Sequence, residues 1–377
     1  MKQKEFFGFG SIKNLKQILK NHKPNKIFLV TGKKSYESSG AKILIDELTN
    51  NFSTFHFSDF ETNPNLYDVK KGIEIFREEK CDFVIAVGGG SVIDIAKSIN
   101  ILSVQTESPE KYIKGELKIN NKGKNLVAIP TTSGSGSEAT HFAVVYIDKT
   151  KFSLAHEDCI LPDYSIVDSQ LTMSLPKSIT ASTGMDALCQ GIESFWCIYS
   201  NDESKSYARE AIKLAINNLK QSVNNPSKKS REAMARAAHL AGKAINISKT
   251  TAAHAVSYPI TSYFNIPHGH AVALTLPYFV PFNAQVTEKD ILDKRGVNYV
   301  KETMKELLKI LNVNTGEEAK NKILKLMQDI NLSTKLKIGE KSMQIIVENG
   351  FNPQRVKNNP RLLSEENLRE ILKNIII

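Results

Sequence analysis

Residues 82–97 read DFVIAVGGGSVIDIAK, and this stretch decides the fold. The continuous apolar run at 82–87 is typical of a strand that is covered on both faces of a sheet. The GGGS segment at 88–91 then leads into a predicted helix at 92–101. Because glycines allow close backbone approach and helix N-termini attract anions, this segment suits a phosphate group. It lacks the G-x-G-x-x-G fingerprint, so taken alone it is equally consistent with a tight strand-to-helix turn.

Outward from this stretch, short β-branched runs alternate with helical patterns through the first half of the chain. The expected strands are 26–31, 52–57, 82–87 and 125–129, and the expected helices are 40–50, 66–79 and 92–101. This alternation is typical of βαβ units, and it predicts a parallel sheet of Rossmann-like type.

From about Pro176 the pattern changes to long periodic helices, and strand signals nearly vanish. The expected helices are 204–220, 229–245, 298–311, 315–328 and 364–375. We therefore predict an α/β dinucleotide-binding domain at 1–172 and an all-α domain at 173–377, with the change near a Leu-Pro pair. No long linker separates them, so we expect a cleft between two closely packed domains.

Composition excludes several classes of protein. The 377 residues carry a net charge of +10 and are 41% hydrophobic, but no segment has the about 18 apolar residues that a membrane span needs. The N-terminus lacks an apolar signal region, and four sparse cysteines do not form a disulfide framework, so we expect a cytoplasmic protein. Because the lysines are scattered over amphipathic helices, we expect no nucleic-acid partner.

A second loop, IPTTSGSGSE at 129–138, also follows a predicted strand. Its hydroxyls and glycines can donate to phosphate and ribose oxygens, and open α/β sheets bind ligands beyond the carboxyl ends of their strands. The two loops together predict a dinucleotide site. The residues expected to contact the cofactor are Gly88, Gly89, Gly90, Ser91, Asp94, Thr131, Thr132, Gly134 and Ser137.

The turn after the first predicted strand bears on cofactor choice. An NAD site usually places an acidic side chain near the ribose 2′-hydroxyl. Here Gly32 and Lys33, followed by another lysine, leave room for a 2′-phosphate and attract it. We therefore expect Gly32 and Lys33 to favour NADP(H) over NAD(H), although the same residues also suit an exposed polar turn.

Four residues of the helical half form a candidate metal site. Asp186 and Gln190 are four residues apart and share one helical face, and His254 and His268 follow. A carboxylate, an amide and two imidazoles can hold a divalent ion and leave a position for a substrate oxygen. Spacing alone is weak support, because a histidine beside a proline turn is commonly a structural hydrogen-bonding residue.

Four motifs in order resemble the iron-dependent (group III) alcohol dehydrogenase family over essentially the whole chain. They are GGGSVIDIAK at 88–97, PTTSGSGSE at 130–138, GMDALCQGIE at 184–193, and His254 with the PHG of 267–269. The resemblance implies the fold shared with dehydroquinate synthase, a metal (iron or zinc) and a nicotinamide between the domains, and a homodimer. Asp186, His254 and His268 occupy the family's ligand positions.

Two residues depart from the family pattern. Gln190 stands where the family usually has a histidine ligand, and Tyr258 stands where many members have a further histidine near the substrate. Glutamine can coordinate through its carbonyl oxygen, but it binds metal ions more weakly than imidazole does.

The stretches GKAINISKTTAAH at 242–254, KFSLAH at 151–156 and PHGHAVA at 267–273 most resemble the branch of this family that reduces phosphonoacetaldehyde or sulfoacetaldehyde. Lys243, Lys249, Thr250 and Thr251 would supply cations and hydroxyls for an anionic head group, unless the lysines simply project into solvent. His156 is a further expected substrate contact. The expected reaction is hydride transfer at a metal-polarised carbonyl, with proton delivery through His270 or Tyr258. Alternatives are a dehydrogenase for uncharged short-chain alcohols and aldehydes, a dehydroquinate-synthase-like lyase, and a non-catalytic dinucleotide-binding protein.

Overall fold

The computed structural model describes residues 3–351 and 353–377. The chain divides into two compact units, Met1–Leu175 and Pro176–Ile377. The division falls within the Leu-Pro pair that marks the change of pattern in the sequence.

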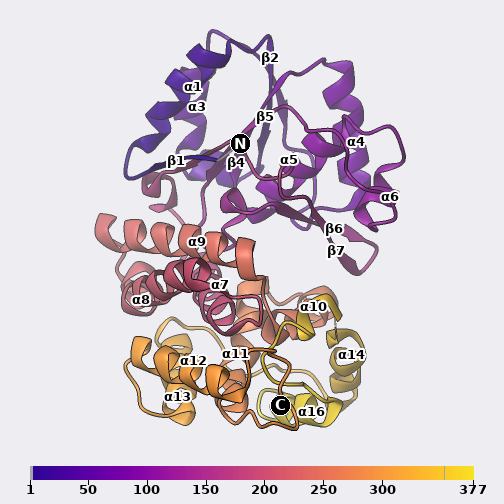
Figure 1. The fold of residues 1–377 in the computed structure, drawn as a ribbon. Coiled ribbons are helices and arrows are strands. Elements are labelled where there is room, and N and C mark those ends of the chain that lie inside the picture. Colours follow the sequence, from indigo (N-terminus) through magenta and orange to yellow (C-terminus); the bar gives the residue numbers. More distant parts are fainter. Residues whose placement is uncertain (1–2, 352) are drawn as a thin grey trace. The chain divides into compact units, whose positions relative to one another are not determined.

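The first unit contains a six-stranded sheet with the order β1-β8-β5-β4-β2-β3 (Figure 1). Its strands are β1 (Lys4–Phe7), β2 (Lys26–Thr31), β3 (Ser53–Phe57), β4 (Phe83–Gly88), β5 (Asn125–Pro130) and β8 (Tyr164–Val167). Each pairs in parallel with its neighbours, which confirms the predicted sheet. Strands β4 and β5 are adjacent, and Gly88 pairs with Pro130, so the two glycine-containing loops leave the sheet at the same point.

Both faces of this sheet are covered. On one face, Phe28, Val84 and Ala128 pack against α4 (Leu66–Glu78) and α5 (Gly90–Leu102). On the other, alternate residues such as Ile27, Ile85 and Val127 pack against α1 (Asn14–His22) and α3 (Ala41–Thr49). Figure 1 shows α1 and α3 on the opposite side of the sheet from α4. Burial on two faces explains why the central strands are continuous apolar runs.

Sequence analysis missed four strands. The edge strand β1 (KEFF) is mostly exposed, and β8 has only four residues, so neither has a long apolar run. The strands β6 (Phe142–Ile147) and β7 (Thr150–Ala155) pair in an antiparallel hairpin outside the main sheet.

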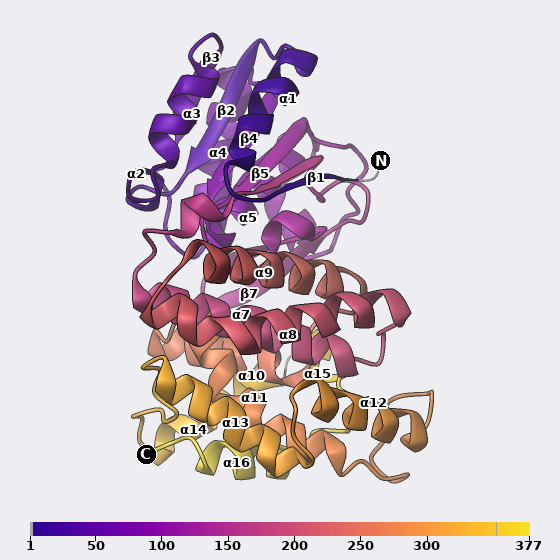
Figure 2. The same ribbon diagram turned by 90° about the vertical axis from the view of Figure 1, so that its left-hand side faces the viewer.

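The second unit is helical, and its helices pack around one large apolar cluster. They are α7 (Lys177–Trp196), α8 (Asp202–Asn224), α9 (Lys228–Ser248), α10 (Ala252–Phe264), α11 (His268–Ala284), α12 (Val297–Ile310), α13 (Gly316–Asp329), α14 (Glu340–Gly350), α15 (Pro353–Val356) and α16 (Glu365–Lys373). Helices α7, α8 and α9 lie side by side (Figure 2). Within the described residues, no helix is long and apolar enough to cross a membrane.

Candidate functional site

The candidate metal ligands converge within the helical unit. Asp186 lies on α7, His254 in the first turn of α10, and His268 at the first position of α11. One potential ligand atom from each lies within 4.8 Å of the others. The Nε2 atom of His254 lies 3.4 Å from the Oδ1 atom of Asp186. Gln190 is buried one helical turn after Asp186, so it lies on the same face of α7.

Gly269 makes this convergence possible, because α11 begins in direct contact with α7. A Cβ atom at position 269 would lie 2.0 Å from the backbone oxygen of Ser182 and 2.8 Å from the Cβ atom of Asp186. Only a residue without a side chain fits here. The neighbouring His268 is therefore brought beside Asp186 by the absence of a side chain at the next position.

A buried glutamate holds the imidazole of His254. Glu193 is 0% exposed, and its Oε2 atom is hydrogen-bonded to His254 Nδ1. This contact leaves Nε2 of His254 directed toward Asp186. A carboxylate on the far nitrogen of a ligand histidine is a common arrangement around protein-bound metals.

The second imidazole is held by a hydroxyl. Ser257 donates to the His254 carbonyl at 2.7 Å, so its oxygen is left to accept from Nδ1 of His268 at 3.4 Å. That contact leaves Nε2 of His268 as the potential ligand atom. The Tyr258 ring stacks on His268, with the ring centroids 6.2 Å apart.

The residues fit a divalent metal ion. Burial lowers the pKa of His254, but the nearby carboxylates of Glu193 and Asp186 outweigh it and raise this pKa to about 10. The carboxylates therefore attract positive charge strongly into a buried position. Two imidazoles, a carboxylate and an adjacent amide form a mixed nitrogen and oxygen set of the kind that iron and zinc accept.

The other residues predicted to take part in catalysis or substrate binding are spread over several elements. The Nε2 atom of His270 donates to the Ser333 carbonyl at 2.7 Å, and burial lowers the pKa of this imidazole. Lys243 on α9 extends over the Tyr207 ring, whose centroid is 4.8 Å from Nζ. Thr250 is buried, and His156 follows β7 in the other unit.

Lys249 has an unusual backbone. It ends α9 with φ 72° and ψ 175°, a region that is essentially restricted to glycine. Its side chain is exposed, with Nζ 5.9 Å from the centroid of the Tyr199 ring.

The two glycine-containing loops lie against each other in the first unit. The Thr131 amide donates to the Gly88 carbonyl at 2.9 Å, and a Cβ atom at Gly90 would lie 2.5 Å from the Ser135 hydroxyl. Gly89 caps α5 without any side-chain hydrogen bond from the described residues. This leaves helix N-terminal amides for a phosphate.

Buried hydroxyls in the second loop also fit a dinucleotide. The side-chain oxygens of Thr131 and Ser133 are buried, and neither makes a hydrogen bond within the part of the chain that is described. Buried polar atoms normally have a partner, so a bound ligand would complete these two. Thr132 is half-buried beside Gly89, and Gly134 is buried.

Asp94 and Ser137 bond to each other. Asp94 accepts from the Ser137 hydroxyl and, at 3.1 Å, from the Val144 amide. The buried Lys97 donates to the backbone oxygens of Ser137, Thr140 and Phe142. These contacts fasten the second loop to α5, so Asp94 and Ser137 have a structural role.

At the turn after β2, one lysine already has a partner. Lys33 forms an ion pair with Asp59 at 2.8 Å, and Asp59 also contacts Lys71. Hydrogen bonds from the two lysines hold the pKa of Asp59 at about 2. Lys34 is exposed, and its ammonium group makes no hydrogen bond or ion pair with the described residues. A Cβ atom at Gly32 would lie 2.3 Å from the Ser35 hydroxyl.

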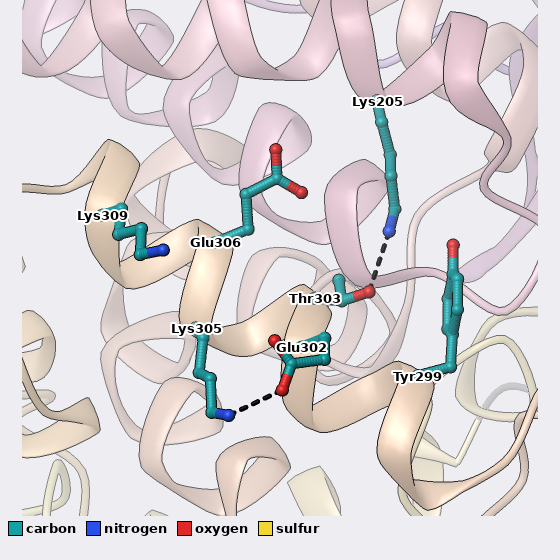
Figure 3. A pocket seen from close by; sticks show the side chains of 7 residues that line it. All are labelled: Lys205, Tyr299, Glu302, Thr303, Lys305, Glu306 and Lys309. Atoms are coloured by element: carbon teal, nitrogen blue, oxygen red, sulfur yellow. Dashed lines mark hydrogen bonds and ion pairs between the residues drawn. The ribbon is translucent and has the colours of Figure 1, made fainter.

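A pocket of about 290 Å³ lies elsewhere in the helical unit, between α8 and α12 (Figure 3). It is lined by Lys205, Tyr299, Glu302, Thr303, Lys305, Glu306 and Lys309. Figure 3 shows Lys205 directed at Thr303 and Lys305 paired with Glu302. None of the residues predicted for catalysis or metal binding lines this pocket.

Sequence reasoning assigned no role to Glu193, Gly269, Lys97 or Asp59. The first three lie within the quoted motifs, which was the available signal. Asp59 follows β3 and meets Lys33 only in the folded sheet, so no local pattern identifies it.

Family models match both units. The model described as "Iron-containing alcohol dehydrogenase" matches residues 3–169, and "Fe-containing alcohol dehydrogenase family, C-terminal" matches residues 180–376.

Individual proteins agree with these matches. Long-chain-alcohol dehydrogenase 1 of Geobacillus thermodenitrificans (strain NG80-2) is 36% identical over 66% of this chain, and the match spans 65% of that relative's length. The NADPH-dependent butanol dehydrogenase of Clostridium saccharobutylicum is 32% identical over 96% of this chain and 88% of its own. The crystal structure of sulfoacetaldehyde reductase from Bifidobacterium kashiwanohense in complex with NAD+ is similar with a TM-score of 0.88 and 32% identity, covering 98% of this chain and 96% of that one.

Proposed function

The chain belongs to the iron-containing alcohol dehydrogenase family, and from this premise we propose that it uses NADPH to reduce a small aldehyde with an anionic head group. Phosphonoacetaldehyde and sulfoacetaldehyde are the substrates that we propose. The similarity to a sulfoacetaldehyde reductase supports this substrate class.

The proposed chemistry divides between bound groups and the chain. A divalent ion at Asp186, Gln190, His254 and His268 would supply a Lewis acid for the carbonyl, and the nicotinamide would supply hydride. Within the chain, Glu193 and Ser257 orient the two imidazoles. This orientation preorganises the site before substrate arrives.

We assign proton delivery to Tyr258. Its ring stacks on His268, beside the candidate ligands, whereas His270 donates its Nε2 proton to the Ser333 carbonyl. The Tyr258 hydroxyl would give its proton to the alkoxide oxygen that forms as hydride reaches the carbonyl carbon.

The strained backbone conformation of Lys249 is the main observation in support of an anionic substrate. A non-glycine residue in this conformation costs about 1–3 kcal/mol, so glycine would be more stable here. Neighbouring contacts hold the strained link: Cys197 donates to the Ser248 carbonyl at 2.7 Å, and Asn358 donates to the Thr250 carbonyl at 2.9 Å. A strained lysine just before the helix that carries His254 is explained if its ammonium group holds the substrate's head.

Substrate panels on Lys249 variants test this assignment. Lys249→Ala should lower kcat/KM for the two anionic aldehydes by about tenfold or more, since a charge-assisted hydrogen bond is worth about 1.5–3 kcal/mol. Turnover of butanal should change little. Lys213→Ala, at an exposed lysine of α8, is the matched control and should alter neither. Equal losses on charged and neutral aldehydes for Lys249→Ala would contradict the proposed head-group contact.

The preference for NADPH rests on the turn after β2. Gly32 presents no carboxylate to a ribose, and Lys34 offers an exposed ammonium group without a carboxylate partner among the described residues. The likeness to an NADPH-dependent butanol dehydrogenase supports this choice. Initial rates with NADPH and NADH test it directly.

A second candidate function is reduction of uncharged short-chain aldehydes. Both Lys243 and Lys249 extend over tyrosine rings, which is also how solvent-exposed lysines pack. Initial rates with phosphonoacetaldehyde, sulfoacetaldehyde and butanal separate the two functions. A lyase that recycles its cofactor would give no net change in NADPH absorbance with any of them.

A further inference from the structure

The buried carboxylate of Glu193 joins α7 to the start of α10. Its Oε1 atom accepts from the Thr251 amide at 3.0 Å, from the Thr251 hydroxyl at 2.7 Å and from the His254 amide at 3.3 Å. Its Oε2 atom contacts Nδ1 of His254. Oε1 therefore accepts hydrogen bonds at the start of α10, whereas Oε2 contacts the imidazole ring of His254.

The direction of each hydrogen bond to Oε1 is fixed. The two backbone N–H groups can only donate. The indole N–H of Trp196, which is also a donor only, points at the Thr251 hydroxyl oxygen at 3.0 Å. The single hydrogen of Thr251 is then directed to Glu193. Three donors converge on Oε1, and this oxygen must stay an acceptor.

We propose that Glu193 is a positioning residue that sets the tautomer of His254. As an ionised carboxylate it accepts the Nδ1 proton, so when the ring gives up one proton it is Nε2 that is left with a lone pair. That lone pair lies on the side of Asp186, 3.4 Å from Oδ1. Glu193 thus prepares His254 to bind a metal ion at Nε2. The inference rests on the proposed function only in taking Asp186, His254 and His268 as a metal site.

The substitution Glu193→Gln would reverse this tautomer without changing the shape of the side chain. Because three donors require an acceptor at the Oε1 position, the new amide must place its NH₂ group against Nδ1 of His254. An NH₂ group facing Nδ1 requires Nδ1 to accept, so the ring proton moves to Nε2. The ligand atom is then blocked by hydrogen.

Comparison with Glu193→Ala separates positioning from simple structural support. Alanine removes the carboxylate but places no donor against Nδ1, so His254 keeps access to the Nδ1–H tautomer. It also leaves three buried donors without their acceptor and opens a cavity. We therefore expect alanine to be the more damaging substitution for thermal stability and glutamine the more damaging one for metal binding.

The experiment measures zinc affinity and thermal unfolding of the full chain without substrate or cofactor. Competition with a chelator should show a 10- to 100-fold loss of zinc affinity for Glu193→Gln and a smaller loss for Glu193→Ala. Asp293→Asn is the matched control: it alters a buried carboxylate of the same unit that pairs with Arg295, and it should retain wild-type zinc affinity. Because no aldehyde is present, failure of the proposed substrate class leaves this result unaffected.

The tautomer is read directly from ¹⁵N spectra of histidine-labelled protein, with His254→Asn to assign the signal. In chelator-treated Glu193→Gln, the neutral ring of residue 254 should carry its proton on Nε2; in zinc-loaded wild type it should carry it on Nδ1. A Nδ1–H ring in Glu193→Gln, or zinc affinity within threefold of wild type for that variant, would overturn the proposal.

Discussion

Gly269→Ala tests how closely α11 must approach α7. The new Cβ atom would lie 2.0 Å from the Ser182 backbone oxygen, whereas ordinary contact begins at 3.4 Å. The start of α11 must therefore move by about 1.4 Å, since a backbone oxygen cannot rotate away. His268 moves with it, and ligand distances at protein metal sites tolerate only about 0.2 Å.

Two effects follow from this displacement. Overpacking of this kind typically costs about 1–3 kcal/mol in unfolding free energy, although alanine is intrinsically the better helix former by about 1 kcal/mol. Loss of one imidazole ligand should lower zinc affinity by at least tenfold. Urea unfolding of metal-free protein measures the first effect, and chelator competition measures the second.

Gly350→Ala is the matched control at the end of α14. The nearest atom to a Cβ there is the Cα of Val256 at 3.6 Å, an ordinary contact, so this variant should be neutral or slightly stabilised and should keep its zinc affinity. If Gly269→Ala binds zinc as tightly as wild type and unfolds at the same urea concentration, the close approach of α11 does not determine the site.

Further predictions concern three lysines and one histidine. Lys97→Met removes the donor from three backbone carbonyls of the loop at 137–142 and should lower the unfolding free energy by about 3 kcal/mol or more, measured by urea denaturation. Lys34→Ala should raise KM for NADPH about tenfold and change KM for NADH little, whereas Lys33→Ala should have a smaller effect because an aspartate already neutralises it; equal effects in steady-state assays would contradict this order. In chelator-treated protein, burial lowers the pKa of His254 but two carboxylates raise it to about 10, above its ordinary 6.5. The stabilisation that it provides is thus complete below pH 6.5 and is lost as pH rises through 10, so urea midpoints of wild type should fall more over that interval than those of His254→Asn.

Sequence patterns predicted the elements that are buried or strongly amphipathic. The strands β2, β4 and β5 are apolar runs because both sheet faces are covered, and α12 has a clear apolar stripe. Helices α10 and α11 were not predicted, since they are apolar on most sides and contain Pro259, Pro277 and Pro281. Their periodicity is weak for the same reason that they lie deep in the unit.

At the candidate site, the sequence identified the potential metal ligands, but it did not identify the residues that position them. Asp186, His254 and His268 could be proposed from residue type and motif, and they do converge. The role of Glu193 depends on which oxygen meets which donor, and that of Gly269 on a 2.0 Å approach between helices. Neither the hydrogen-bond partners of Glu193 nor the distance between the helices at Gly269 can be inferred from the spacing of residues along the chain.

The backbone of Lys249 has an evolutionary consequence. At this position a non-glycine residue is strained by its backbone angles of φ 72° and ψ 175°. A homologue with no anionic substrate to hold would gain stability from a mutation that removes this strain, and glycine removes it best. Lineages that turned to neutral alcohols should therefore have drifted to glycine at this point in the link before α10. A lysine retained there across divergent genomes would mark the descendants still selected for charged aldehydes.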